Sequence, residues 1–202
     1  VTFTCDESGR TLSGTDVTAA LVVLQGMGIS AFGLNCSTGP DKMLVQLRRL
    51  REYARVPLIA KPNAGMPAVV NGTTVYDCTP EEFVAYADGM VQAGVGIFGG
   101  CCGTTPEHLR LTIEKCRKVP FRPPVAKRRT VVSSFSQAVE IGPKPVIIGE
   151  RINPTGKSKF KAALRENNIE YILGEGMAQE DSGAHILDVN VGLPEIDEPV
   201  KI

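Results

Sequence analysis

In the segment Val95-Gly96-Ile97-Phe98-Gly99-Gly100-Cys101-Cys102-Gly103-Thr104-Thr105-Pro106, an apolar run leads directly into two adjacent cysteines and then into a helix start. Threonine caps helices well, and proline fits their first position, so Thr105-Pro106 predicts a helix that begins just after the cysteines. Reactive residues between a buried strand and the following helix occupy the site position of a β/α barrel. The segment therefore predicts a strand, a functional loop and a helix in direct succession.

The rest of residues 1–118 repeats this order of strand and helix. The apolar runs suit a parallel sheet covered by helices, and the repeat of about 30 residues is that of an eight-unit barrel. Four units in place of eight predict an α/β fold that is half of a (β/α)8 barrel of the TIM type. Strands are expected at 1–4, 31–36, 57–61 and 95–99, and helices at 15–27, 40–55, 79–93 and 105–118.

The remainder of the chain predicts a linker and a second domain. Residues 119–144 combine four prolines with a basic cluster, which is typical of an interdomain linker. From residue 145 the pattern is a strand at 146–148, a helix at 169–182 and a strand at 186–192. We interpret 145–202 as the start of a second β/α domain, after a first domain at 1–118.

Composition excludes several classes of protein. The chain of 202 residues is 43% hydrophobic, which suits a packed core, and its 22 basic and 22 acidic residues argue against a nucleic-acid partner. Neither a membrane span nor a signal peptide is visible, so a cytoplasmic protein with reduced or metal-bound cysteines is expected. A first residue of Val1, already within a strand, suggests an excerpt from a longer protein.

The cysteines at the strand ends form a candidate metal site. Cys36 ends the second expected strand, and Cys101 and Cys102 follow the fourth, so a barrel would bring all three to one end. Three thiolates can hold zinc and leave its fourth position open for a substrate thiol, whose pKa the zinc would lower. Two alternatives remain: three ordinary strand-end cysteines, or a closed structural site with a further protein ligand.

The cysteine motifs also resemble a known family. Asn35-Cys36-Ser37 and Gly99-Gly100-Cys101-Cys102-Gly103-Thr104 are similar to the zinc signature of the homocysteine S-methyltransferase family. The resemblance implies a β/α barrel of which this chain supplies the C-terminal half, with zinc held by Cys36, Cys101 and Cys102. Homocysteine sulfur would then take the open position. Lys61 and Asn63, at the end of the third strand, are candidates for the homocysteine pocket.

Two motifs in the second region resemble pterin-binding domains, the barrels that bind methyltetrahydrofolate. They are Gly149-Glu150-Arg151-Ile152-Asn153-Pro154-Thr155-Gly156 and Leu187-Asp188-Val189-Asn190. A pterin edge presents a ring N–H beside an amino group, which a carboxylate can accept, while an amide can both donate and accept. The pterin-binding candidates are Glu150, Asn153, Asp188 and Asn190. Asn153 could instead form a turn before Pro154, and Asp188 could be a structural carboxylate.

Together the two resemblances imply a cobalamin-dependent methyltransferase. Methyl would pass from methyltetrahydrofolate through cobalamin to zinc-activated homocysteine, giving methionine and tetrahydrofolate. An Asp-x-His-x-x-Gly cobalamin motif is missing from the sequence, so a cobalamin domain outside this chain is expected as partner. The alternatives are a homocysteine methyltransferase with another methyl donor, and a structural zinc or interaction module. The excerpt alone is expected to be inactive and either poorly soluble or dimeric.

Overall fold

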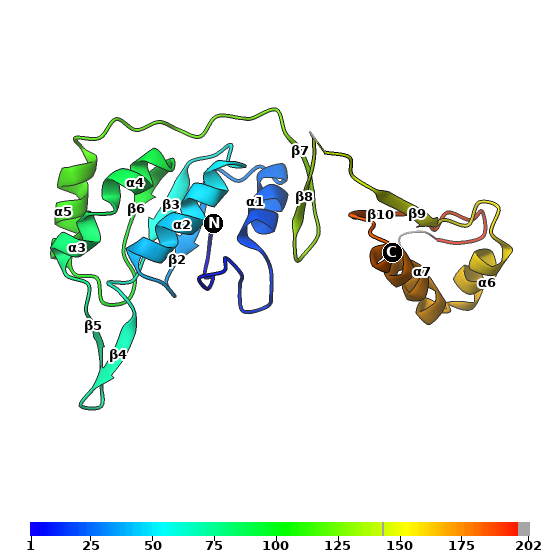
Figure 1. Cartoon of the computed structure of the whole chain (residues 1–202), viewed down its shortest axis with the longest axis horizontal. Coiled ribbons are helices and arrows are strands. Elements are labelled where there is room, and N and C mark those ends of the chain that lie inside the picture. Colours follow the sequence, from blue (N-terminus) through cyan, green and yellow to red (C-terminus); the bar gives the residue numbers. More distant parts are fainter. Residues whose placement is uncertain (143, 198–202) are drawn as a thin grey trace. The chain divides into compact units, whose positions relative to one another are not determined.

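The computed structural model describes residues 1–142 and 144–197, which form a mixed α/β structure in two units (Figure 1). The first unit is residues 1–140, and the second begins at residue 141. Pro143 of the expected linker and the last five residues of the expected second domain lie outside the described residues. Among the described residues, no helix is both long and apolar enough to cross a membrane.

A parallel sheet forms the centre of the first unit. Its four strands within the described residues are β1 (Thr2–Phe3), β2 (Phe32–Asn35), β3 (Leu58–Lys61) and β6 (Val95–Phe98). They are ordered β1-β2-β3-β6, so the strands expected from the sequence pair in chain order. Because all four are parallel, their carboxyl ends, and the loops that follow them, lie at one edge of the sheet.

Helices connect these strands, as the apolar spacing predicts. They are α1 (Val17–Gly26), α2 (Pro40–Arg51), α3 (Pro80–Val84), α4 (Ala87–Gln92) and α5 (Pro106–Cys116). Phe32, Leu34 and Leu58 of the sheet are buried against Leu47 and Leu50 of α2 in the main core. The expected single helix at 79–93 is wrong, because α3 ends at Val84 and α4 begins at Ala87.

A hairpin that the sequence analysis overlooked follows β3. It consists of β4 (Pro67–Val70) and β5 (Thr73–Tyr76), paired antiparallel, and it extends away from the sheet (Figure 1). Asn71 and Gly72 form its turn with positive φ at both positions, the backbone that tight hairpins require. Asn-Gly between β-branched residues is a strong hairpin signal, so this element was predictable.

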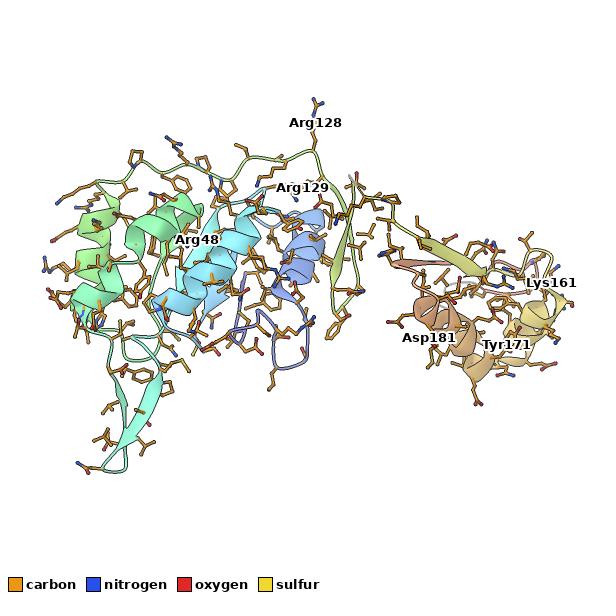
Figure 2. The ribbon with its side chains drawn as sticks, viewed as in Figure 1. Arg48, Arg128, Arg129, Lys161, Tyr171 and Asp181 are labelled. Carbon is orange, nitrogen blue, oxygen red and sulfur yellow. The ribbon has the colours of Figure 1, made fainter. Side chains whose placement is uncertain are left out.

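The expected linker lies along the first unit for much of its length. Lys127 and Arg129 both pair with Glu52 at the end of α2, at 2.8 and 3.3 Å, and the Arg129 guanidinium lies 5.3 Å from the centre of the Tyr53 ring. The side chain of Arg128 instead points away from the helices of the first unit (Figure 2). The segment then forms a hairpin of β7 (Thr130–Ser133) and β8 (Ala138–Ile141), which packs against α1.

The second unit is a parallel strand pair with two helices. Its elements are β9 (Ile148–Ile152), α6 (Ser158–Glu166), α7 (Ile169–Asp181) and β10 (Ile186–Val189). The strand expected at 146–148 therefore begins later and runs to Ile152, and the strand expected at 186–192 ends at Val189. Helix α6 was missed. Ile152, Phe160 and Leu164 form the core of this unit with Val191.

Candidate metal centre

Cys36 lies in a strained turn at the carboxyl end of β2. Cys36 and Ser37 both have positive φ, 61° and 64°, and the Thr38 N–H donates to the Cys36 carbonyl at 2.7 Å. This is a three-residue turn with a left-handed backbone, which costs a residue other than glycine roughly 1–3 kcal/mol. The turn is fixed by its neighbours, since the Cys36 N–H donates to the Lys61 carbonyl of β3 at 3.0 Å.

Cys101 and Cys102 lie in the loop between β6 and α5. The Cys101 N–H donates to the Pro62 carbonyl at 2.9 Å, and the Cys102 carbonyl accepts from the Ala64 N–H at the same distance. Thr104 closes the loop, because its hydroxyl donates to the Cys101 carbonyl at 2.7 Å. The loops after β2, β3 and β6 are thus joined to one another by backbone hydrogen bonds.

The three sulfurs meet in a cluster with the spacing of metal ligands. Cys102 Sγ lies 3.7 Å from Cys36 Sγ and 3.9 Å from Cys101 Sγ, and all three atoms lie within 4.8 Å of one another. Sulfurs bound about 2.3 Å from a tetrahedral zinc are separated by about 3.8 Å. The donor set therefore fits a zinc ion, since the two separations that involve Cys102 match this value and the third is at most 4.8 Å.

The thiols of the cluster influence one another's ionisation. A hydrogen bond from Cys101 holds the pKa of the Cys36 thiol below its usual range. Burial, together with the neighbouring Cys36 sulfur, raises the pKa of Cys101 to about 11. Binding of a metal ion that needs three thiolates would therefore release protons from the cluster.

Asn63 connects the two cysteine loops. Asn63 is buried, and its side-chain amide oxygen accepts the Cys102 N–H at 3.1 Å. The backbone N–H of Asn63 donates to the Thr38 carbonyl at 3.1 Å. A side-chain hydrogen bond from Asn63 also lowers the pKa of Cys36. Lys61, the other candidate for the homocysteine pocket, ends β3 and is half-buried beside Gly99. The sequence predicted both residues as candidates for the homocysteine pocket, but it did not predict that Asn63 forms hydrogen bonds with both cysteine loops.

Tyr76 is a residue of the centre that sequence reasoning missed. It ends β5, and the neighbouring Cys102 thiol raises the pKa of the tyrosine. Its ring lies against Gly103, where an added Cβ would be only 2.3 Å from Tyr76 Cγ. Gly103 also has a φ of +77°, so glycine is required there for both space and backbone.

The other cysteines of the chain lie outside this cluster. Cys5 belongs to the hydrophobic core, and burial raises its pKa to about 11. Cys78 and Cys116 are half-buried, and burial raises the pKa of each. Among the described residues, the grouping suited to a metal ion is therefore that of Cys36, Cys101 and Cys102.

The candidate pterin residues gather on the two neighbouring strands of the second unit. Asn153 follows β9 and Asn190 follows β10, and the Asn190 N–H donates to the Ile152 carbonyl at 2.8 Å. Each asparagine also accepts a backbone N–H two residues ahead, from Thr155 and Gly192 respectively, at 2.9 Å. The amide oxygens therefore shape their own turns.

The two acidic candidates lie inside the strands. Asp188 is exposed on β10, at a register shift where it lies between the pairs Leu187–Gly149 and Val189–Ile152. Such bulges re-aim side chains and are common beside active sites. Glu150, which follows the strand expected at 146–148, lies within β9, where it is exposed and pairs with Lys157 at 3.5 Å.

Comparison with known proteins identifies a family for most of the first unit. The family model described as homocysteine S-methyltransferase matches residues 1–116. The chain is 35% identical over 199 residues to methionine synthase of Mycobacterium leprae, and 34% identical over 196 residues to methionine synthase of Mycobacterium tuberculosis. These matches cover 95% and 93% of this chain but 16% of each relative, so the chain spans about a sixth of their length.

Similar solved structures include the homocysteine methyltransferase MmuM from Escherichia coli. Its oxidised form is 24% identical with a TM-score of 0.42, over 55% of this chain and 33% of that protein. Its apo form gives the same identity and TM-score, over 54% of this chain and 35% of that protein.

Proposed function

The chain belongs to the homocysteine S-methyltransferase family over residues 1–116, and on that premise we propose that Cys36, Cys101 and Cys102 hold a zinc ion at which homocysteine sulfur is methylated. The observation that carries the proposal is the spacing of 3.7 and 3.9 Å between the sulfurs. Zinc in such a site binds a substrate thiol as a nucleophilic thiolate at neutral pH.

The residues of the chain supply the positioning. The turn at Cys36 and the Asn63 amide hold the first sulfur, and backbone hydrogen bonds from the loop after β3 fix the cysteine pair. Because Cys102 is exposed, the cluster is accessible to a substrate thiol from that side. Lys61 and Asn63 are proposed to line the homocysteine pocket, as both lie at the strand ends that carry the cluster.

We propose that the chain contains parts of two β/α barrels joined by a linker. The parallel order β1-β2-β3-β6 supports residues 1–118 as the C-terminal half of a (β/α)8 barrel. Residues 119–144 would join it to a second barrel that begins at 145. The parallel pair β9 and β10 with α6 and α7 supports such a beginning.

The methyl donor is proposed to be methyltetrahydrofolate, with cobalamin, bound by another domain, as the intermediate carrier. Asn153, Asp188 and Asn190 lie at or near the carboxyl ends of adjacent parallel strands, where barrels bind their ligands, and Glu150 lies on the same pair. The similarity to two methionine synthases continues through this region, which supports a role of both units in methionine synthesis.

Zinc content and X-ray absorption at the zinc edge test the proposal, measured on the intact protein with and without homocysteine. We expect about one zinc with three sulfur ligands, and a fourth sulfur when homocysteine is added. Cys36→Ser, Cys101→Ser and Cys102→Ser are each expected to lose zinc, whereas Cys116→Ser, outside the cluster, retains it. Absence of zinc, or four protein ligands unchanged by homocysteine, would overturn the proposal.

A binding measurement with methyltetrahydrofolate distinguishes this methyl donor from the alternatives. We expect the intact protein to bind it, and Asp188→Ala to weaken binding about 10-fold or more, the value of a hydrogen bond to a charged group. A protein that methylates homocysteine without binding any folate would point to another methyl donor.

A further inference from the structure

A buried histidine, His108, joins the start of α5 to the segment that follows the β4–β5 hairpin. It lies in the first turn of α5 and is 4% exposed. The Thr105 N–H donates to its Nδ1 at 3.2 Å, and its Nε2 lies 3.0 Å from the Cys78 carbonyl oxygen. Because a carbonyl group has no proton to donate, Nε2 must carry the proton, which leaves Nδ1 as the acceptor. The neutral imidazole therefore uses one nitrogen for each of the two segments.

Packing fixes the orientation of this imidazole. Phe83 of α3 is buried and meets it edge-on, with the ring centroids 5.3 Å apart and the ring planes at 87°. Helix α3 follows the hairpin and packs against α5 (Figure 1). Because an edge-to-face contact restricts rotation of the imidazole, the Nε2–H stays directed at the Cys78 carbonyl.

Backbone hydrogen bonds continue from Cys78 to the cysteine pair. The Cys78 N–H donates to the Ala64 carbonyl at 3.1 Å, and the Ala64 N–H donates to the Cys102 carbonyl at 2.9 Å. Thr105, the other partner of His108, is three residues after Cys102 in the sequence. These contacts, which we call the His108 network, therefore begin and end in the loop of the cysteine pair. The imidazole is the side chain that closes the network, since the other groups belong to the backbone.

We propose that His108 is a positioning residue of the candidate metal centre: its imidazole holds the loop of Cys101 and Cys102 in place for the metal ion. The inference rests on the proposed zinc-dependent function. His108 acts through the backbone and not as a ligand, because both of its nitrogens have backbone partners. Residues that orient metal ligands from outside the first shell are typically worth 10–100-fold in metal affinity or activity, and this indirect role belongs at the lower end.

Asparagine and glutamine at position 108 separate this role from capping of α5. Asparagine places its amide oxygen near the position of Nδ1 and still accepts the Thr105 N–H, but it is too short to reach the Cys78 carbonyl. Glutamine is longer by one carbon, so it presents an N–H near the position of Nε2, and it is a usual residue at this position of a capping box. If His108 only capped the helix, the two variants would behave alike.

We expect His108→Asn in the intact protein to bind zinc about 10-fold more weakly in competition with a chelator, and His108→Gln to restore most of the affinity. Asp16→Ala is the control for lost stability, because it removes a buried helix cap that lies outside the His108 network, and it should leave zinc affinity unchanged. Wild-type affinity in His108→Asn would overturn the inference. Equal losses in the Asn and Gln variants, or an equal loss in Asp16→Ala, would also overturn it.

Hydrogen exchange of the metal-free protein gives a second measurement that does not depend on zinc. In His108→Asn we expect the Cys78 and Ala64 amides to exchange about 5-fold faster than in the wild type, as the loss of one hydrogen bond implies. The Ala20 amide of α1, outside the network, should keep its rate. Unchanged rates at Cys78 and Ala64 would overturn the inference even if zinc affinity falls.

The wild-type protein distinguishes this inference from the proposed function. If it holds no zinc at the three cysteines, the proposed function fails, while the exchange rates still test whether His108 holds the cysteine loop. If it holds zinc and binds homocysteine, and His108→Asn behaves like the wild type in both measurements, only the role of His108 fails.

Discussion

Asn63 shows how much of the metal centre depends on a single buried side chain. Its amide oxygen accepts the Cys102 N–H, its side chain lowers the pKa of the Cys36 thiol, and its backbone N–H donates to the Thr38 carbonyl of the strained turn. Alanine at this position would leave the Cys102 N–H without this acceptor. A single residue, Asn63, therefore stabilises both cysteine loops.

We expect Asn63→Ala to lower zinc affinity at least 10-fold and to reduce stability by about 1–3 kcal/mol, because the part-buried hydrogen bond from the Cys102 N–H loses its acceptor. Chelator competition and the thermal midpoint measure the two effects. Asn190→Ala is the matched control, since it removes an amide that also accepts a backbone N–H, but in the second unit.

The two variants are expected to differ in what they bind. Asn63→Ala should keep methyltetrahydrofolate binding and lose zinc, and Asn190→Ala should do the reverse. Loss of both ligands in either variant would show that the two units are not independent sites.

At residue scale the sequence indicated which cysteines lie together but not the geometry of the cluster. Cysteines after apolar strands, with glycines around them, predicted the cluster of Cys36, Cys101 and Cys102 that the structure brings together. The positive φ of Cys36 and Ser37 could not be predicted, because neither residue favours that backbone. The contact of Tyr76 with Cys102 depends on the tertiary position of the hairpin, which local patterns do not carry.

At the scale of secondary-structure elements, short sequence motifs with a defined chemical role predicted helix starts correctly, whereas periodicity was less reliable. The Thr-x-x-Glu pattern at Thr79 and Glu82 forms a capping box, with the Thr79 N–H donating to Glu82 at 2.8 Å and the Glu82 N–H donating to Thr79 at 3.3 Å. The break between α3 and α4 has no proline or glycine to mark it, so periodicity alone merged the two helices. Tertiary packing decided that boundary.

Asp16 links two helices and gives a prediction at this scale. It caps α1 by accepting the Thr18 N–H at 2.8 Å, and it pairs with Arg49 of α2 at 2.5 Å. Burial would raise the pKa of Asp16, but the hydrogen bonds from Arg49 and Thr18 outweigh it and hold the pKa below its usual range. The ionised carboxylate is therefore the form that stabilises the fold.

Asp16→Ala is expected to lower stability by about 0.5–2 kcal/mol at neutral pH, the usual cost of losing an N-cap. Because the folded pKa is depressed, this contribution is present above the unfolded pKa of about 3.9 and is lost as pH falls through the folded value. Thermal melts of wild type and variant should converge in acid. A difference that stays constant down to pH 2 would contradict the assignment.

Asp16→Asn separates the two contacts. Asparagine remains a good N-cap but carries no charge for Arg49, so its loss of stability should be smaller than that of alanine. Equal losses in the two variants would mean that the ion pair, not the cap, dominates.

For the whole molecule, the sheet of the first unit has an open edge on each side. Within the described residues β1 and β6 are its outermost strands, and Ile97 of β6 is 48% exposed. In the second unit, Leu173 and Met177 of α7 are also more than half exposed, beside exposed apolar residues of β9 and β10. Open edges and apolar patches of this kind promote association between chains.

We therefore expect the 202-residue chain alone to self-associate, and light scattering after size-exclusion chromatography measures its mass. Ile97→Lys places a charge on the open edge of β6, which blocks edge-to-edge pairing and should shift the population towards monomer. Lys42→Arg, which preserves the charge of an exposed position on α2, is the control and should leave the mass unchanged. A monodisperse monomer that unfolds cooperatively would contradict the expectation, because it would show that these edges and patches are tolerated in water without a partner.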